Sequence, residues 1–193
     1  MFRDLIGSSP GGSDSEAVVW KTRVMSKTKT KKSTSEKARK KGAPPEPPSY
    51  LSLLNAIAVA ETEAERFLLG WANVTDNAEV AEALRFVAMR EGEHGMAFAK
   101  RMLELGYEVR WPSSKKSDAR FAMACSSMSD IEKFKAFGVG RKPGGPDVFD
   151  RMFENKDLDP VTGGLLGRYI AEERDSARIL RAARKCAKAA AKK

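Results

Sequence analysis

The sequence predicts an all-α protein, an antiparallel four-helix bundle with a broken third helix that follows a disordered basic extension. In the long segments after residue 50, apolar residues recur at steps of three and four, the spacing of one helix face. Aromatic residues make up only 8% of the chain, while charged residues make up 32%. No segment alternates apolar and polar residues as a half-buried strand does. These observations favour helices that pack through one apolar face each.

The first 49 residues lack the composition of a folded segment. A Gly/Ser stretch leads into Lys/Thr/Ser-rich sequence and then into the proline-rich run Ala43–Pro48. Such sequence is typical of an extended, disordered chain. We therefore expect a basic extension over residues 1–49, a helical domain over 50–183 and a basic tail over 184–193.

Two long helices open the predicted domain. The first is expected over about residues 50–73, with an apolar stripe made of Leu54, Ile57, Ala64, Leu68 and Trp71. The second is expected over about residues 77–105. Asp76 or a neighbour would cap its start, and Gly106 would end it.

The remaining helices are shorter or interrupted until the last one. A broken third helix is expected over about residues 117–138, because Ser129 and Glu132 have the spacing of a capping box that restarts a helix. A short amphipathic helix is expected over 147–155. Asp159 followed by Pro160 predicts the start of the last helix, a cap followed by proline at the first position. The stripe assigned to that helix is Leu165, Tyr169, Ile179, Ala183 and Cys186.

Ionisable residues interrupt the apolar stripes of three of these helices. They are Glu61 in the first helix, Glu91 and His94 in the second, and Glu172 with Asp175 in the last; His94 is the only histidine of the chain. Burying a charge costs several kcal/mol unless the charge is paired or coordinates a metal. The stripes therefore predict either a hydrogen-bonded His–Glu pair or a metal site. Other acids of these helices, Glu173 among them, are expected to face solvent.

The pattern resembles the ferritin-like superfamily, which includes ferritins, bacterioferritins and rubrerythrins and has a glutamate on one helix and Glu-x-x-His on the next. Residues 91–94 have the rubrerythrin form Glu-x-Glu-His, and residues 172–175 resemble its second Glu-x-x-His with aspartate at the histidine position. The resemblance implies a carboxylate-bridged iron site, di-iron in its complete form. It also implies oxidation of Fe(II), or reduction of dioxygen or peroxide, as the activity.

Carried over to this chain, the resemblance assigns a role to each candidate ligand. Glu61 would be a terminal ligand, Glu91 would bridge two ions, and His94 would bind the first ion. Glu172 would bridge or bind the second ion, with Asp175 in place of a second histidine. Carboxylate oxygens and one imidazole suit iron or manganese, with zinc as a competitor.

The third helix leaves a second hypothesis open. Its inward face is expected to be apolar, with Phe121, Met128 and Ile131, so it adds no carboxylate to the site. The site is then a complete di-iron centre, a weak one, a single-metal site or no metal site. In the last case the protein is a ferritin-like scaffold or a nucleic-acid-associated protein that acts through its lysine-rich tails. The sequence does not decide between an oxidoreductase of ferroxidase or peroxidase type and a protein without catalytic activity.

The positive charge of the chain is concentrated at its two ends. The net charge is +9, and residues 21–42 carry ten Lys/Arg against one Glu, while residues 181–193 carry six Lys/Arg and no acid. Such tails predict binding of nucleic acid or another polyanion through Lys21–Lys41 and the C-terminal tail, by counterion release. No apolar run approaches the roughly 18 residues of a membrane span. Two distant cysteines favour the reducing cytoplasm, and we expect a homo-oligomer.

Overall fold

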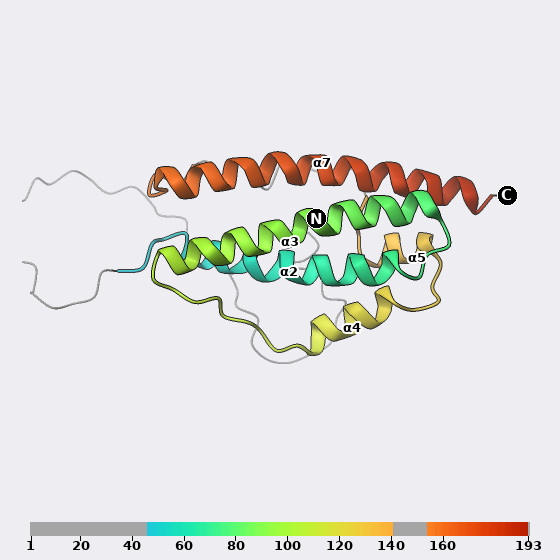
Figure 1. Cartoon of the computed structure of the whole chain (residues 1–193), viewed down its shortest axis with the longest axis horizontal. Coiled ribbons are helices and arrows are strands. Elements are labelled where there is room, and N and C mark those ends of the chain that lie inside the picture. Colours follow the sequence, from blue (N-terminus) through green and yellow to red (C-terminus); the bar gives the residue numbers. More distant parts are fainter. Residues whose placement is uncertain (1–45, 141–153, 193) are drawn as a thin grey trace, which may run out of the picture. The chain divides into compact units, whose positions relative to one another are not determined.

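The computed structural model describes residues 46–140 and 154–192, which form helices and no strands. The helices are α2 (Leu51–Ala72), α3 (Ala78–Glu104), α4 (Lys115–Ala124), α5 (Asp130–Ala136) and α7 (Pro160–Ala190) (Figure 1). The all-α prediction is confirmed for this part of the chain. The extension before residue 46 and most of the helix predicted over 147–155 lie outside the described residues. Among the described helices, none has the length and the apolar content that crossing a bilayer requires.

Side-chain caps start three of the helices. The Asn77 side chain accepts a hydrogen bond from a backbone amide of α3, so the cap is the neighbour of Asp76. Ser129 and Glu132 form the predicted capping box of α5. At the start of α7, the Asp159 side chain accepts from two backbone amides, and Pro160 occupies the first turn. These residues satisfy amide groups that a helix start otherwise leaves without partners.

Buried apolar side chains form two separate clusters. The first cluster includes Leu68 of α2, Val87 of α3 and Leu180 of α7, together with residues of α5. The second cluster includes Leu54 of α2, Phe98 of α3 and Tyr169 of α7. Each long helix thus passes from one cluster to the other, and the residues between the two clusters form a layer of their own.

The order of the clusters along each helix gives the directions of the three long helices. α2 and α7 both start in the second cluster and end in the first, whereas α3 runs the opposite way (Figure 1). An antiparallel bundle in which each helix reverses the one before it would direct the last helix opposite to the first; that order is wrong here, because α7 runs parallel to α2. The reason is that α7 begins at the end of the domain where α2 begins, and not at the end where α5 lies. The hydroxyl of Tyr50, at the start of α2, donates a hydrogen bond to Asp159, whereas α5 packs beside Trp71 near the end of α2.

The broken third helix predicted over about residues 117–138 corresponds to two separate helices in the structure. Two short helices occupy the region, with α4 packed against α2 and α5 packed against α7. The indole nitrogen of Trp71 donates a 2.7 Å hydrogen bond to Asp130, which fixes the start of α5 to the end of α2. A ferritin-like four-helix bundle stays a prediction, while α2, α3 and α7 provide the frame that positions the candidate site.

Candidate metal centre

Four ionisable side chains meet in the layer between the two apolar clusters. They are Glu61 from α2, Glu91 and His94 from α3, and Glu173 from α7. One potential ligand atom of each residue lies within 4.8 Å of those of the other three. Their positions along the helices account for this meeting, because each residue falls where its helix leaves one apolar cluster and enters the other. We call these four residues the buried cluster.

The buried cluster is removed from solvent and short of hydrogen-bond donors. The exposed fractions are 1% for Glu61, 0% for Glu91, 5% for His94 and 3% for Glu173. Within the described residues, no hydrogen bond reaches Oε2 of Glu61, either carboxyl oxygen of Glu91, Nδ1 of His94 or Oε1 of Glu173. Buried polar atoms without partners are rare in folded proteins and call for an explanation such as an ion. The cluster therefore has several free lone pairs directed into one enclosed space.

The carboxyl groups of the buried cluster hold their protons more tightly than usual. Burial raises the pKa of Glu61 well above its ordinary value, and the facing carboxyl of Glu91 adds to the rise. Burial is also the main reason that the pKa of Glu91 rises to about 8. The pKa of Glu173 rises to about 7, through burial and then through the charge of Glu61. Three carboxylates cannot all be charged here at low cost unless a cation enters.

Tyr169 holds one member of the cluster in place. Its hydroxyl donates a 2.8 Å hydrogen bond to Oε1 of Glu61, which joins α7 to α2. Its ring meets His94 edge to face, with ring centroids 5.0 Å apart, and Phe98 in the same manner at 5.1 Å. These two aromatic rings belong to the second apolar cluster and form the side of it that faces the buried cluster, where they limit the movement of Glu61 and His94.

Two glycines allow α2 and α3 to approach each other closely beside the cluster. A Cβ atom on Gly95 would lie 2.6 Å from Oγ1 of Thr62 and 3.1 Å from its backbone nitrogen. A Cβ atom on Gly92 would lie 2.6 Å from the Glu65 carboxyl group. At Gly92 the Glu65 side chain could move aside, whereas at Gly95 a backbone atom is in the way, so Gly95 in particular helps to bring Glu61 within reach of Glu91.

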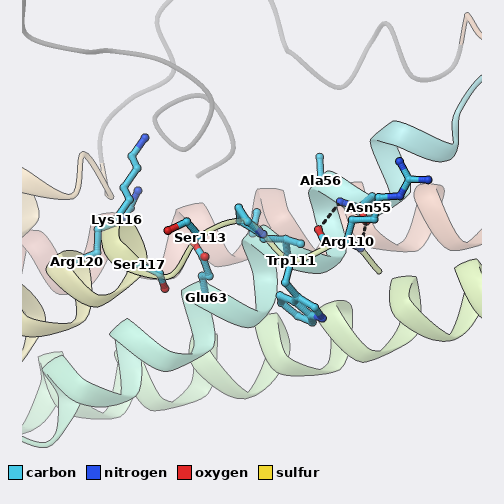
Figure 2. Close-up of a pocket in the computed structure, with 12 residues that line it drawn as sticks. Asn55, Ala56, Glu63, Arg110, Trp111, Ser113, Lys116, Ser117 and Arg120 are labelled. Carbon is cyan, nitrogen blue, oxygen red and sulfur yellow. Dashed lines mark hydrogen bonds between the residues drawn. The ribbon is translucent and has the colours of Figure 1, made fainter. Parts of the chain in front are cut away.

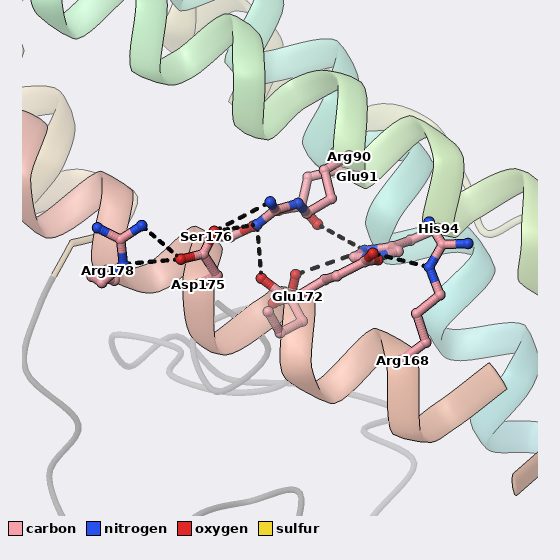
Figure 3. A network of polar contacts seen from close by, with 9 residues as sticks. Arg90, Glu91, His94, Arg168, Glu172, Asp175, Ser176 and Arg178 are labelled. Atoms are coloured by element: carbon pink, nitrogen blue, oxygen red, sulfur yellow. Dashed lines mark hydrogen bonds and ion pairs between the residues drawn. The ribbon is translucent and has the colours of Figure 1, made fainter. Parts of the chain in front are cut away.

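The structure places the predicted residues of the last helix outside the buried cluster. Glu172 has a side-chain exposure of 26%, and its Oε2 lies 2.7 Å from Nε2 of His94, on the outer side of the imidazole ring (Figure 3). Asp175 is 37% exposed and pairs with Arg90 and Arg178. Glu173, expected to face solvent, is the acid of α7 that points inward. That expectation was wrong.

A shift of one residue in the buried face of α7 explains this difference. The observed buried residues follow steps of three and four through Thr162, Leu166, Tyr169, Glu173, Ser176, Leu180, Ala183 and Ala187. The predicted stripe has the same steps and shares Tyr169 and Ala183 with the observed one. One residue corresponds to about 100° around the helix. The apolar residues Leu166, Ile170 and Leu180 are the signal that favours the observed face and places Glu173 inside.

The donor set of the buried cluster fits a divalent transition metal ion. Three carboxylates and one imidazole, without sulfur, are ligands that iron and manganese accept and that zinc accepts as well. The unpartnered oxygens of Glu91 point to the same space as those of Glu61 and Glu173. Neither α4 nor α5 adds an acid to the cluster, as the sequence predicted for the third helix. The candidate centre is therefore built by three helices.

A second concave feature is separate from the buried cluster. Residues of α2, the segment 110–113 and the start of α4 line a surface groove of about 710 Å³ (Figure 2). Asn55 forms two hydrogen bonds with the backbone of Arg110 at its edge, and Trp111 is exposed beside it. None of the lining residues belongs to the buried cluster. The groove is therefore a separate surface feature, and no candidate ligand of the metal centre lines it.

Comparisons with models of protein families, with curated proteins and with solved structures gave no match for this chain.

Proposed function

We propose that this chain is a ferritin-like iron protein that oxidises Fe(II) or reduces dioxygen or peroxide at the buried cluster. The observation that carries the proposal is the meeting of Glu61, Glu91, His94 and Glu173 in an enclosed space with unpartnered lone pairs. The resemblance of Glu61 and of Glu91-x-x-His94 to the ferritin-like ligand pattern supports it. In the proposed centre Glu173 takes the place of Glu172 and Asp175 as the ligand from α7, and His94 is the one histidine of the set.

The ligand types favour iron as the ion. Carboxylate oxygens stabilise Fe(III) as well as Fe(II), and one imidazole is compatible with both states. When bound, two ferrous ions supply the two electrons that, with two protons, convert dioxygen to hydrogen peroxide, or hydrogen peroxide to two molecules of water. Manganese and zinc compete for the same donors, so metal analysis of the purified protein is needed to identify the bound ion.

The protein's own contribution begins with the protons of the carboxyl groups. Because the pKa values of Glu91 and Glu173 are raised to about 8 and about 7, these groups retain protons near neutral pH. A cation that enters displaces those protons, and the charge of the ion replaces them. Tyr169 continues to donate to Glu61 and so keeps one of its oxygens in a fixed direction. The packed aromatic rings beside the cluster limit the access of water.

Metal analysis of the purified full-length protein tests this proposal. Protein from iron-supplemented cells should contain between one and two equivalents of iron, and anaerobic addition of Fe(II) followed by air should consume dioxygen. Glu91→Ala should lose both properties. Glu93→Ala is the matched control, since Glu93 lies two residues away and its side chain is 62% exposed. Folded protein that binds neither iron nor manganese nor zinc, and behaves like Glu91→Ala, would contradict the proposal.

A second candidate function is the binding of a polyanion through the basic ends of the chain. Lys185 and Lys188 in the last turns of α7 and Lys192 just after the helix are exposed, and residues 21–41 lie outside the described part of the chain. Retention on immobilised DNA should fall steeply as salt increases, since lysine contacts with phosphate release counterions. Replacing the lysines between Lys21 and Lys41 by glutamine should weaken this retention and leave the metal content unchanged. Equal retention of the two proteins at each salt concentration would rule out that role for the N-terminal lysines.

A further inference from the structure

The two ring nitrogens of His94 lie in different surroundings. Nε2 lies 2.7 Å from Oε2 of Glu172. Nδ1 has no hydrogen-bond partner among the described residues and lies 3.8 Å from oxygens of both Glu91 and Glu173. The ring therefore directs one nitrogen to a carboxylate at the edge of the domain and the other into the buried cluster.

Glu172 is itself held in position through both its carboxylate and its backbone carbonyl. Nε of Arg168, one turn earlier on α7, donates a 2.9 Å hydrogen bond to Oε1 of Glu172. Nη1 of Arg90 on α3 donates to the backbone carbonyl of Glu172 at 3.0 Å, and the same guanidinium group donates to Asp175 (Figure 3). Oε2 of Glu172 is thus presented to His94 by a fixed arrangement of α3 and α7.

We infer that Glu172 is not a ligand but a positioning residue, which accepts the Nε2–H of His94 and thereby directs Nδ1 toward the ion. This inference rests on the proposed metal binding by the buried cluster. A histidine that binds an ion through one nitrogen keeps its proton on the other, and an acceptor for that proton fixes both the tautomer and the ring orientation. The inference reverses the role that the resemblance assigns to Glu172, and it leaves this partly exposed carboxylate outside the set of ligand atoms.

The single histidine makes this inference directly measurable. In full-length protein labelled with ¹⁵N-histidine, all imidazole signals come from His94. With one equivalent of Zn²⁺ as a diamagnetic probe, the Nδ1 resonance should shift on binding. Nε2 should carry a proton whose signal persists in water because it is hydrogen-bonded. Binding without a persistent Nε2–H signal, or a shift of Nε2 in place of Nδ1, would overturn the inference while leaving the metal site intact.

Variants of Glu172 separate positioning from ligation. Glu172→Ala should broaden or remove the Nε2–H signal and weaken Zn²⁺ binding about 10- to 100-fold, the usual effect of removing an outer partner of a ligating histidine. Glu172→Gln retains an acceptor oxygen, so it should restore the signal and part of the affinity. Asp175→Asn is the matched control, because Asp175 shares Arg90 with this arrangement but does not contact His94. Unchanged Zn²⁺ affinity in Glu172→Ala would overturn the inference. Failure of the unaltered protein to bind Zn²⁺, Fe(II) or Mn²⁺ would overturn the proposed function as well.

Discussion

The hydroxyl of Tyr169 on α7 donates a 2.8 Å hydrogen bond to Oε1 of Glu61 on α2, and both side chains are buried. This bond links the two parallel helices within the polar layer. It favours the charged form of Glu61, since it lowers a pKa that burial and Glu91 raise. The packing of α7 therefore affects cation binding by Glu61, because the bond from Tyr169 favours the charged carboxylate that a cation needs.

Tyr169→Phe should weaken both properties. The substitution leaves Oε1 of Glu61 buried without a donor, a loss that costs about 1–3 kcal/mol of unfolding free energy in metal-free protein. The pKa of Glu61 should rise further, so Zn²⁺ binding at pH 7 should become weaker. Denaturant unfolding and a metal titration measure the two effects. Tyr107→Phe serves as a control on a partly exposed tyrosine, and a Tyr169→Phe protein with unaltered affinity would show that the hydrogen bond does not prepare Glu61 for metal binding.

The comparison of sequence and structure shows which features local patterns determine. The helices and the caps at Ser129 and Asp159 follow from residues close in sequence, and the structure has them. The inward positions of Glu61, Glu91 and His94 follow from apolar neighbours on both sides of each residue, and these residues are buried. The buried face of α7 was misassigned because two stripes one residue apart both satisfy helical spacing. Leu166, Ile170 and Leu180 favour the observed stripe, but the two stripes share Tyr169 and Ala183, so it is the packing against α3 that decides between them.

The direction of α7 illustrates a second limit of the sequence. Helix directions depend on how the connections run, and the short amphipathic helix predicted over 147–155 does not fix the direction of the helix that follows it. The hydrogen bond between Tyr50 and Asp159, 109 residues apart, fixes the end at which α7 begins. Contacts of this kind become visible only when the chain is folded.

The stability of the metal-free protein should decrease as the pH rises from about 5 to about 8. The pKa of Glu91 is raised from 4.5 to about 8 in the folded protein, so the folded state retains a proton that the unfolded chain releases above pH 4.5. The stability tied to that proton is complete below the unfolded pKa and is lost as the pH approaches the folded pKa. Thermal unfolding at successive pH values in the presence of a chelator measures the slope, and Glu91→Gln should reduce it. A slope of the opposite sign across this range would contradict the raised pKa values.

Metal binding should oppose this loss of stability with rising pH. Ions compete with protons for the same oxygens, so the increase in melting temperature caused by Zn²⁺ should grow between pH 5.5 and pH 7.5. The exposed variant Glu93→Ala should show the same growth as the unaltered protein. A stabilisation that does not depend on pH would indicate binding elsewhere on the chain.

Glu173→Gln should remove metal binding, whereas Asp175→Asn should not. Glu173 contributes a ligand atom to the buried cluster, while Asp175 forms ion pairs with Arg90 and Arg178 at the edge of the domain. In metal-free protein at pH 8, Glu173→Gln should raise the unfolding free energy by about 1–3 kcal/mol, because it removes a buried charge that has too few partners. Calorimetric titration with Zn²⁺ and denaturant unfolding check both statements. Loss of binding in Asp175→Asn with retention in Glu173→Gln would restore the ligand assignment that the resemblance implies.

Gly95→Ala should disturb the candidate centre through the backbone. A Cβ atom at this position meets Thr62 at 2.6 Å from Oγ1 and at 3.1 Å from the backbone nitrogen, so α2 and α3 must separate. Overpacking of this kind costs about 1–3 kcal/mol, and the separation should also weaken metal binding because it moves Glu61 away from Glu91. Gly167→Ala on α7 is the matched control, since no atom lies within 4 Å of its added Cβ. That control should gain about 0.5–1 kcal/mol from the higher helix propensity of alanine. Equal stability changes in the two variants would show that the close approach of α2 and α3 at Gly95 does not hold the site together.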